Sequence, residues 1–493
     1  MQAGIVQRGR YRRDVILSVR AVLAALCVAL AVAGCSQPTK VDGRAVSMQY
    51  DPYRVAGLPT TDGPSGPRVP APSALGRVQN TDDGDIDRTA LLAIDDIEDF
   101  WTKHYSQSFA GSFVPVSRLI SVDPRTPMTV CGEQSAVFEF NALFCVPDDL
   151  IAWDRVNLLP VAREFFGDMT INGLLAHEYG HALQWQAGLV GEQTSSILVR
   201  EQQADCLAGV YLRWVAEGNS PRFTLNTSRA LDQVLAGAIA GRDPISTYDT
   251  LALDPPSHGT ALERVSAIQT GFDAGPDGCA AIDSAEIEQR RGGLPASLFD
   301  TASPQSDIAI DDQTLATLME LMGQIFPMTD PPTLATDGSG CPVGRQRPVA
   351  YCPDSNTIAV DMPALQQAGA PADESDFVLL QGDNTALSMV ISRYVLALQR
   401  DRGLPLDSPV AAMRTACLTG VAQRKMAEPI EGPSGNQLVI GAGDLDEAVS
   451  GLLTNAVAAT DVNGIPVPSG FTRILAFRTG LLGDAEGCFQ RFA

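Results

Sequence analysis

Residues 174–184, LLAHEYGHALQ, contain two of the four histidines in the chain. Within this stretch His177, Glu178 and His181 match the pattern His-Glu-x-x-His. On an α-helix, positions i and i+4 lie on the same face, so the two imidazoles can hold one Zn²⁺ ion between them. The intervening glutamate can then reach a water molecule on the metal and act as a general base. The pattern predicts a catalytic zinc site on a helix.

A catalytic zinc site needs a third protein ligand and keeps one position for water. Glu201 begins the stretch EQQAD, twenty residues after His181, which leaves room for a turn and the start of a second helix. Asp205 follows on the same helical face, where it can accept a hydrogen bond from a ligand histidine. Taken alone, an acid such as Glu201 is more commonly a solvated side chain. His104 belongs to an amphipathic helix, and we interpret it as a surface or core residue.

The first 34 residues are typical of a signal peptide. Five arginines are followed by an uncharged stretch from Ala21 to Gly34, which is shorter than the roughly 20 residues that span a bilayer. The residues just before Cys35 resemble a bacterial lipobox, which predicts Cys35 as the lipidated first residue of the mature chain. The alternative is a signal peptide with a coincidental cysteine. We therefore expect a lipid-anchored protein of the bacterial cell envelope, on the outer face of the cytoplasmic membrane.

The charge and the cysteines narrow the function further. A net charge of −23 argues against nucleic acid or an anionic membrane surface as a partner. Once Cys27 of the signal peptide and the predicted lipidation site Cys35 are set aside, eight cysteines remain, and an even number in an exported protein predicts disulfides. The chain has no Cys-x-x-Cys pair, which disfavours a zinc–thiolate site.

The hydrophobic pattern predicts an α+β fold that is mostly helical. Residues 35–85 are rich in proline and glycine, and we expect a disordered tether there. In the zinc domain, predicted over residues 86–295, a helix with apolar residues from Leu91 to Tyr105 precedes short strand-like runs: SRLISV, SAVFEF, NALFCV and DLIAWD. Helices then follow at LLAHEYGHALQ, ILVREQQADCLAGVYLRWVAEG, TLNTSRALDQVLAGAIAG and SHGTALERVSAIQTGF. The small β-sheet should lie beside the His-Glu-x-x-His helix.

The second domain, predicted over residues 300–493, resembles a degenerate copy of the first. CPVGRQRPVAYCPDSNTIAVD parallels CGEQSAVFEFNALFCVPDDLIAWD, and LSMVISRYVLALQRDRGL parallels GLLAHEYGHALQWQAGL. Further along, ACLTGV parallels DCLAGV, and FTRILAFRTGLLGDAEGC parallels LERVSAIQTGFDAGPDGC. Four cysteines recur in the same order with similar spacing. We interpret this as a duplication, against the alternative of coincidental similarity between helical segments.

The alignment of the two copies carries two consequences. In the second copy Ser392 takes the position of His177, Arg393 that of Glu178, and Leu396 that of His181. Ala412 takes the position of Glu201, so the second copy cannot form this zinc site. If the halves are copies, disulfides should form within each half: Cys131–Cys145, Cys206–Cys279, Cys341–Cys352 and Cys417–Cys488.

The motifs also resemble a known family. The following segments are similar to those of a bacterial neutral zinc metallopeptidase family: HEYGHALQ from residue 177, EQQADCLAG from 201, HGT from 258, RV from 264, GFDAG from 271, and the upstream VCG and LFCVPDDLIAWD. The resemblance runs from about residue 89 to residue 280. It implies a zincin-like fold with zinc ligands His177, His181 and Glu201, and it implies Glu178 as the catalytic base.

Two further residues take roles from the same resemblance. Asp205 follows the ligand Glu201 by four residues, as in the family. His258 heads the family's His-Gly-Thr/Ser segment, and we assign it to stabilising the oxyanion of the tetrahedral intermediate. The alternative for His258 is a residue at a helix start that hydrogen-bonds the backbone.

The sequence thus predicts a membrane-anchored zinc metalloendopeptidase with an inactive companion domain. Its substrate would be a protein or peptide, added as an extended strand near NALFCV. The alternative is a non-catalytic envelope lipoprotein that acts as a binding or scaffold protein, with a structural zinc. A zinc ion with an open fourth coordination position would favour the peptidase, and a zinc ion with four protein ligands would favour the binding protein.

Overall fold

The computed structural model describes residues 39–41, 44–46, 50–70, 72–191, 196–244, 258–295, 298, 308–344, 346–441 and 443–493. The chain divides into two compact units, Met1–Met48 and Gln49–Ala493. In the first unit the structure describes only the paired strands β1 (Thr39–Val41) and β2 (Arg44–Val46). The predicted signal peptide and Cys35 lie outside the described residues. No helix of the described residues is long and apolar enough to cross a membrane.

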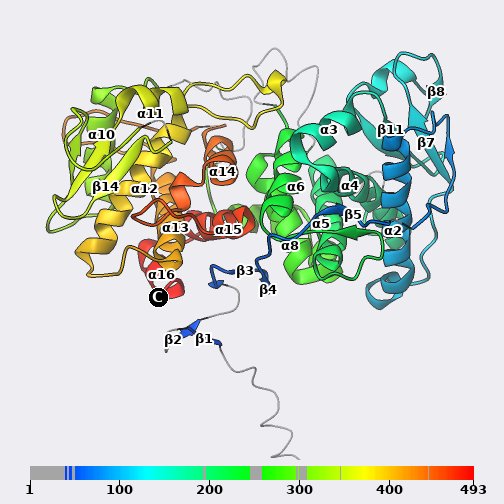
Figure 1. Ribbon diagram of the computed structural model, residues 1–493, viewed down its shortest axis with the longest axis horizontal. Coiled ribbons are helices and arrows are strands. Elements are labelled where there is room, and N and C mark those ends of the chain that lie inside the picture. The colour runs from blue at the N-terminus through cyan, green and yellow to red at the C-terminus, as the bar shows by residue number, and fades with distance from the viewer. Residues whose placement is uncertain are drawn as a thin grey trace, which may run out of the picture. The chain divides into compact units, whose positions relative to one another are not determined.

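The second unit is α+β and mostly helical (Figure 1). Its first half, residues 50–295, contains β3 (Arg54–Val55), β4 (Leu58–Pro59), β5 (Gly66–Pro67), β6 (Val78–Gln79), α2 (Asp85–Ser108), β7 (Arg118–Val122), β8 (Thr129–Val130), β9 (Glu133–Gln134), η2 (Ser135–Phe138), β10 (Ala142–Cys145), β11 (Leu150–Asp154), α3 (Leu158–Phe166), α4 (Asp168–Ala187), α5 (Ile197–Ala216), β12 (Phe223–Thr224), α6 (Arg229–Ala240), α8 (Ala261–Ala280) and α9 (Ser284–Arg291). Its second half, residues 308–493, contains α10 (Asp312–Ile325), β13 (Thr333–Ala335), β14 (Val349–Cys352), β15 (Thr357–Val360), α11 (Met362–Ala368), η4 (Glu374–Asp376), α12 (Asp383–Asp401), α13 (Pro409–Met426), α14 (Asp444–Thr454), η5 (Val457–Ala459), α15 (Gly470–Leu481) and α16 (Ala485–Arg491).

The stretch before α2 packs onto the first half instead of forming a tether. Strand β5 pairs with β12, β6 pairs with β7, and Val55 is fully buried. The prediction of a disordered tether over residues 35–85 is therefore wrong from Tyr50 onward. The prolines and glycines there make tight turns between very short strands, and composition alone does not separate such turns from disorder.

The sheet of the first half lies beside α4, as predicted. Its strand order is β10-β11-β7-β6, with β10 antiparallel to β11 and the other pairs parallel. Strand β10 is thus an edge strand, and its residue Phe144 donates a backbone hydrogen bond to Glu178 of α4 at 3.1 Å. The sheet therefore presents one edge to the helix that carries the His-Glu-x-x-His motif.

One of the predicted strands is absent. The first four residues of the run SAVFEF form the 3₁₀ helix η2, and the two-residue strands β8 and β9 come directly before it. The Ser135 hydroxyl donates to the carbonyl of Thr126 at 2.8 Å and accepts from the amide of Met128 at 3.2 Å. Such local side-chain bonds to the backbone compete with a strand ladder, so the alternation of apolar residues did not decide the structure here.

Buried polar bonds fix α4 against its neighbours. The hydroxyl of Tyr179 in α4 donates to Glu98 of α2 at 2.9 Å. The hydroxyl of Tyr211 in α5 donates to Asp96 of α2 at 2.8 Å and accepts from Asn172 of α4 at 3.0 Å. Helix α4 ends at Ala187, and the left-handed backbone of the next residue, Gly188 (φ +67°), lets its amide close the last turn. Three helices are thereby held in one register around the motif.

Helices α5 and α8 cross at very short range. A Cβ added to Gly271 would lie 1.8 Å from the carbonyl oxygen of Cys206, so only glycine permits this approach. The disulfide Cys206–Cys279 ties the same two helices. The crossing therefore fixes α5, which carries Glu201 and Asp205, against the end of the first half.

The second half has the same order of elements. Strands β14, β15 and β13 follow the pairing of β10, β11 and β7, with one antiparallel and one parallel pair. Helices α13 and α15 cross as α5 and α8 do, because a Cβ on Gly480 would lie 1.8 Å from the carbonyl oxygen of Cys417. The predicted disulfides Cys131–Cys145, Cys206–Cys279, Cys341–Cys352 and Cys417–Cys488 are all present.

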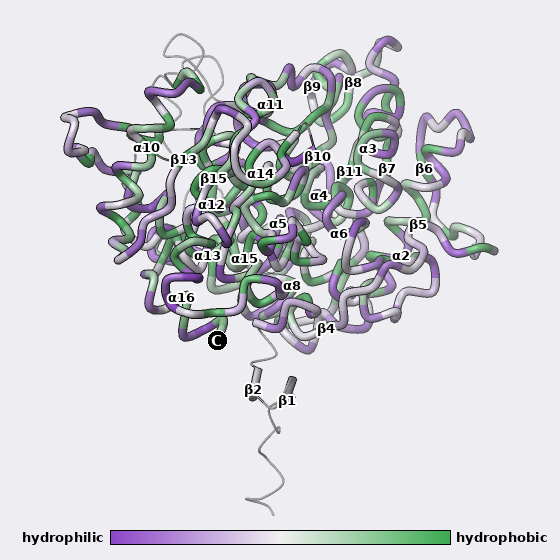
Figure 2. Tube along the Cα trace, turned by 60° about the vertical axis from the view of Figure 1, so that its left-hand side comes forward, coloured by the Kyte–Doolittle hydropathy of each residue, from purple (hydrophilic) through white to green (hydrophobic). Residues whose placement is uncertain are grey.

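The two halves belong to one compact unit and not to two separate domains. The side chain of Gln269 in α8 donates to the carbonyl of Phe471 in α15 at 2.8 Å, and the rings of Phe272 and Phe471 lie 5.2 Å apart. Hydrophobic residues fill the interior across both halves, and hydrophilic residues lie mainly on outer loops and helix faces (Figure 2). The predicted boundary near residue 300 therefore does not separate independent cores.

The helix crossings predict the effect of adding one methyl group. Gly271→Ala and Gly480→Ala should each lower the free energy of unfolding by roughly 3 kcal/mol, because the new Cβ meets a backbone oxygen that cannot turn away. Gly63→Ala, with no atom within 4 Å of its added Cβ, is the control and should change stability by under about 0.5 kcal/mol. Urea unfolding measures all three, and equal stability of Gly271→Ala and Gly63→Ala would contradict the prediction.

Candidate metal centre

Helices α4 and α5 bring three of the predicted residues together. His177, His181 and Glu201 each offer a ligand atom, and these atoms lie within 4.8 Å of one another. The Glu201 Oε2 atom lies 3.2 Å from His177 Nε2 and 3.5 Å from His181 Nε2. This carboxylate oxygen is buried and makes no hydrogen bond of good geometry with the described residues. Two imidazoles and one carboxylate thus converge on a common point.

The Nδ1 atom of each imidazole has a hydrogen-bond partner other than Glu201. His177 Nδ1 lies 2.7 Å from Asp205 Oδ1, and His181 Nδ1 lies 3.2 Å from Gln184 Oε1. The amide of Gln184 is itself held, because its nitrogen donates to the carbonyl of Arg200 at 2.5 Å. With each Nδ1 donating its proton outward, the Nε2 lone pairs face Glu201. Metal-binding histidines are oriented in this way.

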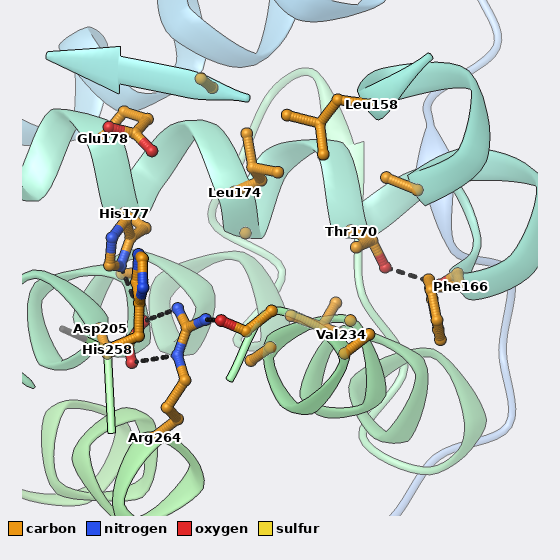
Figure 3. Close-up of a pocket in the computed structure, with 18 of the residues that line it drawn as sticks. Leu158, Phe166, Thr170, Leu174, His177, Glu178, Asp205, Val234, His258 and Arg264 are labelled. Atoms are coloured by element: carbon orange, nitrogen blue, oxygen red, sulfur yellow. Dashed lines mark hydrogen bonds and ion pairs between the residues drawn. The ribbon is translucent and has the colours of Figure 1, made fainter. Parts of the chain in front are cut away.

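Arg264 completes the support of His177. From α8 its guanidinium donates two hydrogen bonds to Asp205, at 2.9 and 2.8 Å, and a third to the carbonyl of Gly241 at 2.6 Å. Burial raises the pKa of Asp205, but Arg264 and His177 outweigh it and hold the carboxyl ionised. Figure 3 shows Arg264 reaching Asp205 beside His177.

The charges of the site fit a divalent cation. Asp205, Glu201 and Glu178 supply three carboxylates, and Arg264 supplies one guanidinium. With both imidazoles neutral, this buried group carries two negative charges. Without a cation the carboxylates act on His177 instead: burial lowers its pKa, but Asp205, Glu201 and Glu178 together raise it to about 10. Two histidines, one carboxylate and two unbalanced charges fit Zn²⁺.

Glu178 lies beside the group formed by His177, His181 and Glu201, but it is not one of the three residues whose ligand atoms converge. Its side chain is 9% exposed, and its Oε2 atom accepts the Phe144 amide of edge strand β10. Burial raises the pKa of Glu178, while His177 and His181 act in the opposite direction. A carboxylate with a raised pKa beside a metal site is suited to take up and return a proton.

The structure also brings His258 to the site. His258 Nε2 lies 3.6 Å from Glu201 Oε2, and its ring centroid lies 6.2 Å from that of His177 (Figure 3). Its side chain is 42% exposed, and it does not belong to the group of mutually close ligand atoms. The backbone amide of His258 donates to Asp243 at 3.0 Å. His258 therefore lies on the solvent-exposed side of this group.

Two supporting residues were not identified from the sequence. Gln184 carries a weak signal, because it follows His181 by three residues on the same helical face. Arg264 belongs to the segments that resemble the metallopeptidase family, but its role could not be assigned, since its partner Asp205 is far away in the sequence. His104 lies on α2, partly buried, with its ring 4.7 Å from that of Phe100, and it does not belong to the described group of close ligand atoms.

In the second half, side chains of other types occupy the matching positions. Ser392, Arg393, Leu396 and Ala412 are all buried. Arg393 donates to the carbonyls of Val457 and Asp461 and, at 2.6 Å, to the hydroxyl of Thr460. Burial lowers the pKa of Arg393 to about 9. The loop before α15 therefore closes onto this guanidinium.

A buried acidic group in the second half has an evident structural role. Asp383, Asp444 and Glu447 lie close together. Glu447 accepts the amide of Asn384 near the start of α12 at 2.9 Å, and Asp444 accepts the amide of Gly441 at 2.7 Å. These carboxylates satisfy backbone donors at helix starts and loops.

Residues 241–243 connect the metal centre to the second half. Gly241 accepts from Arg264, and Asp243 accepts from the amides of His258 and Gly259 at 3.0 and 2.7 Å. Between them, the buried Arg242 pairs with Glu374 at 2.8 Å and Asp446 at 3.2 Å, both from the second half. Asp446 also accepts the amide of Ala261 at the start of α8.

Asp446 predicts a specific pH dependence of stability. Burial raises its pKa from 3.8 to about 6, although Arg242 and the Ala261 amide oppose the shift. Between about pH 4 and 6 the folded state therefore binds a proton that the unfolded chain has released, so the contribution of Asp446 to stability falls as the pH rises. Asp446→Asn lacks this loss, and wild type should lose about 3 kcal/mol relative to the variant across this range.

Urea unfolding of both proteins at pH 4 and pH 7 measures this difference. The exposed Asp312→Asn controls for the general loss of one negative charge. A gap between wild type and Asp446→Asn that stays constant with pH would show that Asp446 does not titrate in this way.

Comparisons with protein-family models, with curated proteins and with solved structures give no match to this chain. The resemblance to a metallopeptidase family therefore rests on the motifs alone. Function has to be argued from the geometry and chemistry of the site itself.

Proposed function

We propose that this protein is a zinc-dependent metalloendopeptidase. The observation that carries the proposal is the buried Glu201 Oε2, which lies 3.2 and 3.5 Å from two imidazole nitrogens whose opposite nitrogens are fixed by Asp205 and Gln184. His177, His181 and Glu201 would hold the metal. When bound, Zn²⁺ supplies Lewis acidity, which lowers the pKa of water and polarises a peptide carbonyl.

Glu178 performs the proton transfers in this proposal. Its buried carboxylate takes a proton from the attacking water and delivers it to the leaving amine. The Phe144 amide holds the carboxylate in place. His258 faces the same space with a partly exposed ring, from which it would donate a hydrogen bond to the developing oxyanion. Asp205, backed by Arg264, keeps the ring of His177 in one tautomer and orientation.

Edge strand β10 supports an extended peptide as substrate. It pairs with β11 on one side only, and its other side faces α4 and Glu178. An extended chain placed along this edge would gain backbone hydrogen bonds without its sequence being read. A protein or peptide is therefore the expected substrate class.

The alternative, a binding protein with a structural zinc, is less well supported. Structural zinc sites are closed by four protein ligands, whereas only three described residues form the ligand group here. A cavity of about 360 Å³ also opens beside His177 and Glu178. Both features favour catalysis.

We infer that the two halves arose by duplication of one zincin-like domain of this metallopeptidase family. Matched disulfides, sheet pairing and helix crossings support this inference. A matching pair of hydrogen bonds supports it further: Gln184 donates to the carbonyl of Arg200, and Gln399 donates to the carbonyl of Ala411 at the corresponding position. In addition, Arg473 occupies the position of Arg264 in the alignment. The second copy has lost the ligands and is inactive as a peptidase.

We also propose that the protein is a bacterial lipoprotein held at the outer face of the cytoplasmic membrane by Cys35. This proposal rests on the residues that precede Cys35, which lie outside the described part of the chain. The four disulfides support an exported location, because such bonds persist in oxidising compartments.

The division of roles between base and ligand can be tested with two variants. Glu178→Gln should keep one zinc per chain and lose at least about 100-fold in peptidase rate, because the base is removed and no ligand is. His181→Ala should lose both zinc and activity. The exposed Glu164→Gln is the matched control and should retain both. Atomic absorption and hydrolysis of a denatured protein give the two readouts, and normal hydrolysis by Glu178→Gln would overturn the mechanism.

The lipid anchor makes a separate prediction. Cys35→Ala should abolish metabolic labelling with a radioactive fatty acid and shift the protein from the membrane fraction to the soluble fraction, because the thiol is the site of acylation. Cys27→Ala, which changes a cysteine inside the predicted signal peptide, is the control and should label normally. Persistent labelling of Cys35→Ala would remove the lipoprotein assignment.

A further inference from the structure

An apolar cavity adjoins the metal centre. Its volume is about 360 Å³, and His177, Glu178 and His258 lie at one end of it. The remaining wall is mainly apolar and comes from α3, α4, α5, α6 and α8, with Leu158, Leu174, Leu212, Val234 and Ile268 among its residues. Figure 3 shows Leu158, Leu174 and Val234 around this space, on the side of His177 that leads toward the start of α4.

Two of the polar groups in the wall already have hydrogen-bond partners within the protein. The Thr170 hydroxyl donates to the carbonyl of Phe166 at 2.7 Å, and Asp205 is bound to Arg264 and His177. A charged or polar group entering the cavity would lose its hydration and find few partners. The cavity is also more than twice the size of a 150 Å³ apolar cavity that accepts benzene. Its shape and chemistry therefore suit a large apolar side chain.

One wall residue comes from the second half. Phe377 lies between α11 and α12, in a segment that extends from α11 toward α3 and α6 and is drawn in yellow in Figure 1. Its ring centroid lies 4.9 Å from that of Phe165 on α3 and 6.1 Å from that of Phe140 before β10. Phe377 thus contacts α3 and the segment before β10, which are two of the parts of the first half that border the cavity.

The segment around Phe377 is anchored on both sides. Before it, Glu374 accepts two hydrogen bonds from Arg242, at 2.8 and 3.1 Å, and the Arg242 side chain is only 2% exposed. After it, Leu379 and Leu380 are buried, at 5% and 8% exposure. The position of Phe377 is therefore fixed by the packing of the two halves.

We propose that this cavity receives an aromatic or long aliphatic side chain of a peptide substrate, next to the bond to be cleaved, and that Phe377 forms part of its wall. The proposal rests on the proposed peptidase function. It assigns the second half a direct part in substrate selection: that half lost its metal ligands but completes the pocket of its active neighbour.

Cleavage of a mixed-sequence peptide library by the zinc-loaded wild type, mapped by mass spectrometry, tests the preference. Cleavage sites should be enriched in Phe, Leu or Met at one position beside the scissile bond. In a matched series that varies only this position, kcat/KM should be roughly 10- to 100-fold higher for Phe than for Ala, and lowest for Glu. Equal kcat/KM across the series would overturn the pocket and leave the peptidase function standing.

Two variants test the contribution of Phe377. Phe377→Ala should reduce the preference for Phe over Ala about 5- to 10-fold, mainly through KM, with unchanged zinc content. Val378→Ala removes a neighbouring side chain that is 43% exposed, and it should behave as wild type. An unaltered preference in Phe377→Ala would exclude the second half from the pocket. Leu174→Trp, which fills the cavity from α4, should shift the preference toward small side chains.

A binding measurement separates this inference from the peptidase function. Zinc-loaded Glu178→Gln should bind the Phe peptide at least 10-fold more tightly than the Ala peptide in calorimetry, and Phe377→Ala in that background should narrow the gap. If wild type hydrolyses no peptide, the peptidase proposal fails. The same calorimetry then decides the pocket, which is supported by a Phe preference and overturned by equal affinity.

Discussion

The carboxylate of Asp205 is the constraint on which the site depends. It is almost completely buried, and a buried charge must be paired to be tolerated. Its two partners come from different helices: His177 of α4 and Arg264 of α8. Because Asp205 itself lies on α5, this one side chain fixes the relative positions of three helices and the direction of a ligand nitrogen. A change of register in any of the three would leave a charge unpaired in the core.

The network of ion pairs and hydrogen bonds around Asp205 extends to the second half. Arg264 binds the carbonyl of Gly241, and the adjacent Arg242 pairs with Glu374 and Asp446. Asp446 in turn holds the amide of Ala261 at the start of α8, three residues after His258. The segments that border the site are therefore fixed by both halves. This explains why the halves form one compact unit although each contains its own sheet, disulfides and helix crossing.

Local patterns in the sequence predicted much of this arrangement. The spacing of His177 and His181 predicted that both side chains lie on one face of α4. The repeated cysteines predicted all four disulfide pairs. What sequence did not reveal depends on contacts between distant segments. Arg264 meets Asp205 only after α5 and α8 cross, and Phe377 reaches the cavity only through the packing of the halves. The strands before α2 were missed because strands of two or three residues leave no periodic signal.

If the two halves arose by the proposed duplication, electrostatics explains the substitutions in the second half. A site that no longer holds a cation cannot keep its buried carboxylates unpaired, because each would lose its hydration without compensation. The position of Glu201 holds Ala412, and that of Asp205 holds Ala416, so both charges are removed. Arg473, at the position of Arg264, donates to the backbone carbonyls of Val467, Leu452 and Pro468, and it lies 3.9 Å from the carboxylate of Asp232 in the first half. Arg393 likewise satisfies its guanidinium on the loop before α15. In the proposed duplication, loss of the metal site thus left two buried guanidinium groups, those of Arg393 and Arg473, which are satisfied mainly by backbone carbonyls without disruption of the fold.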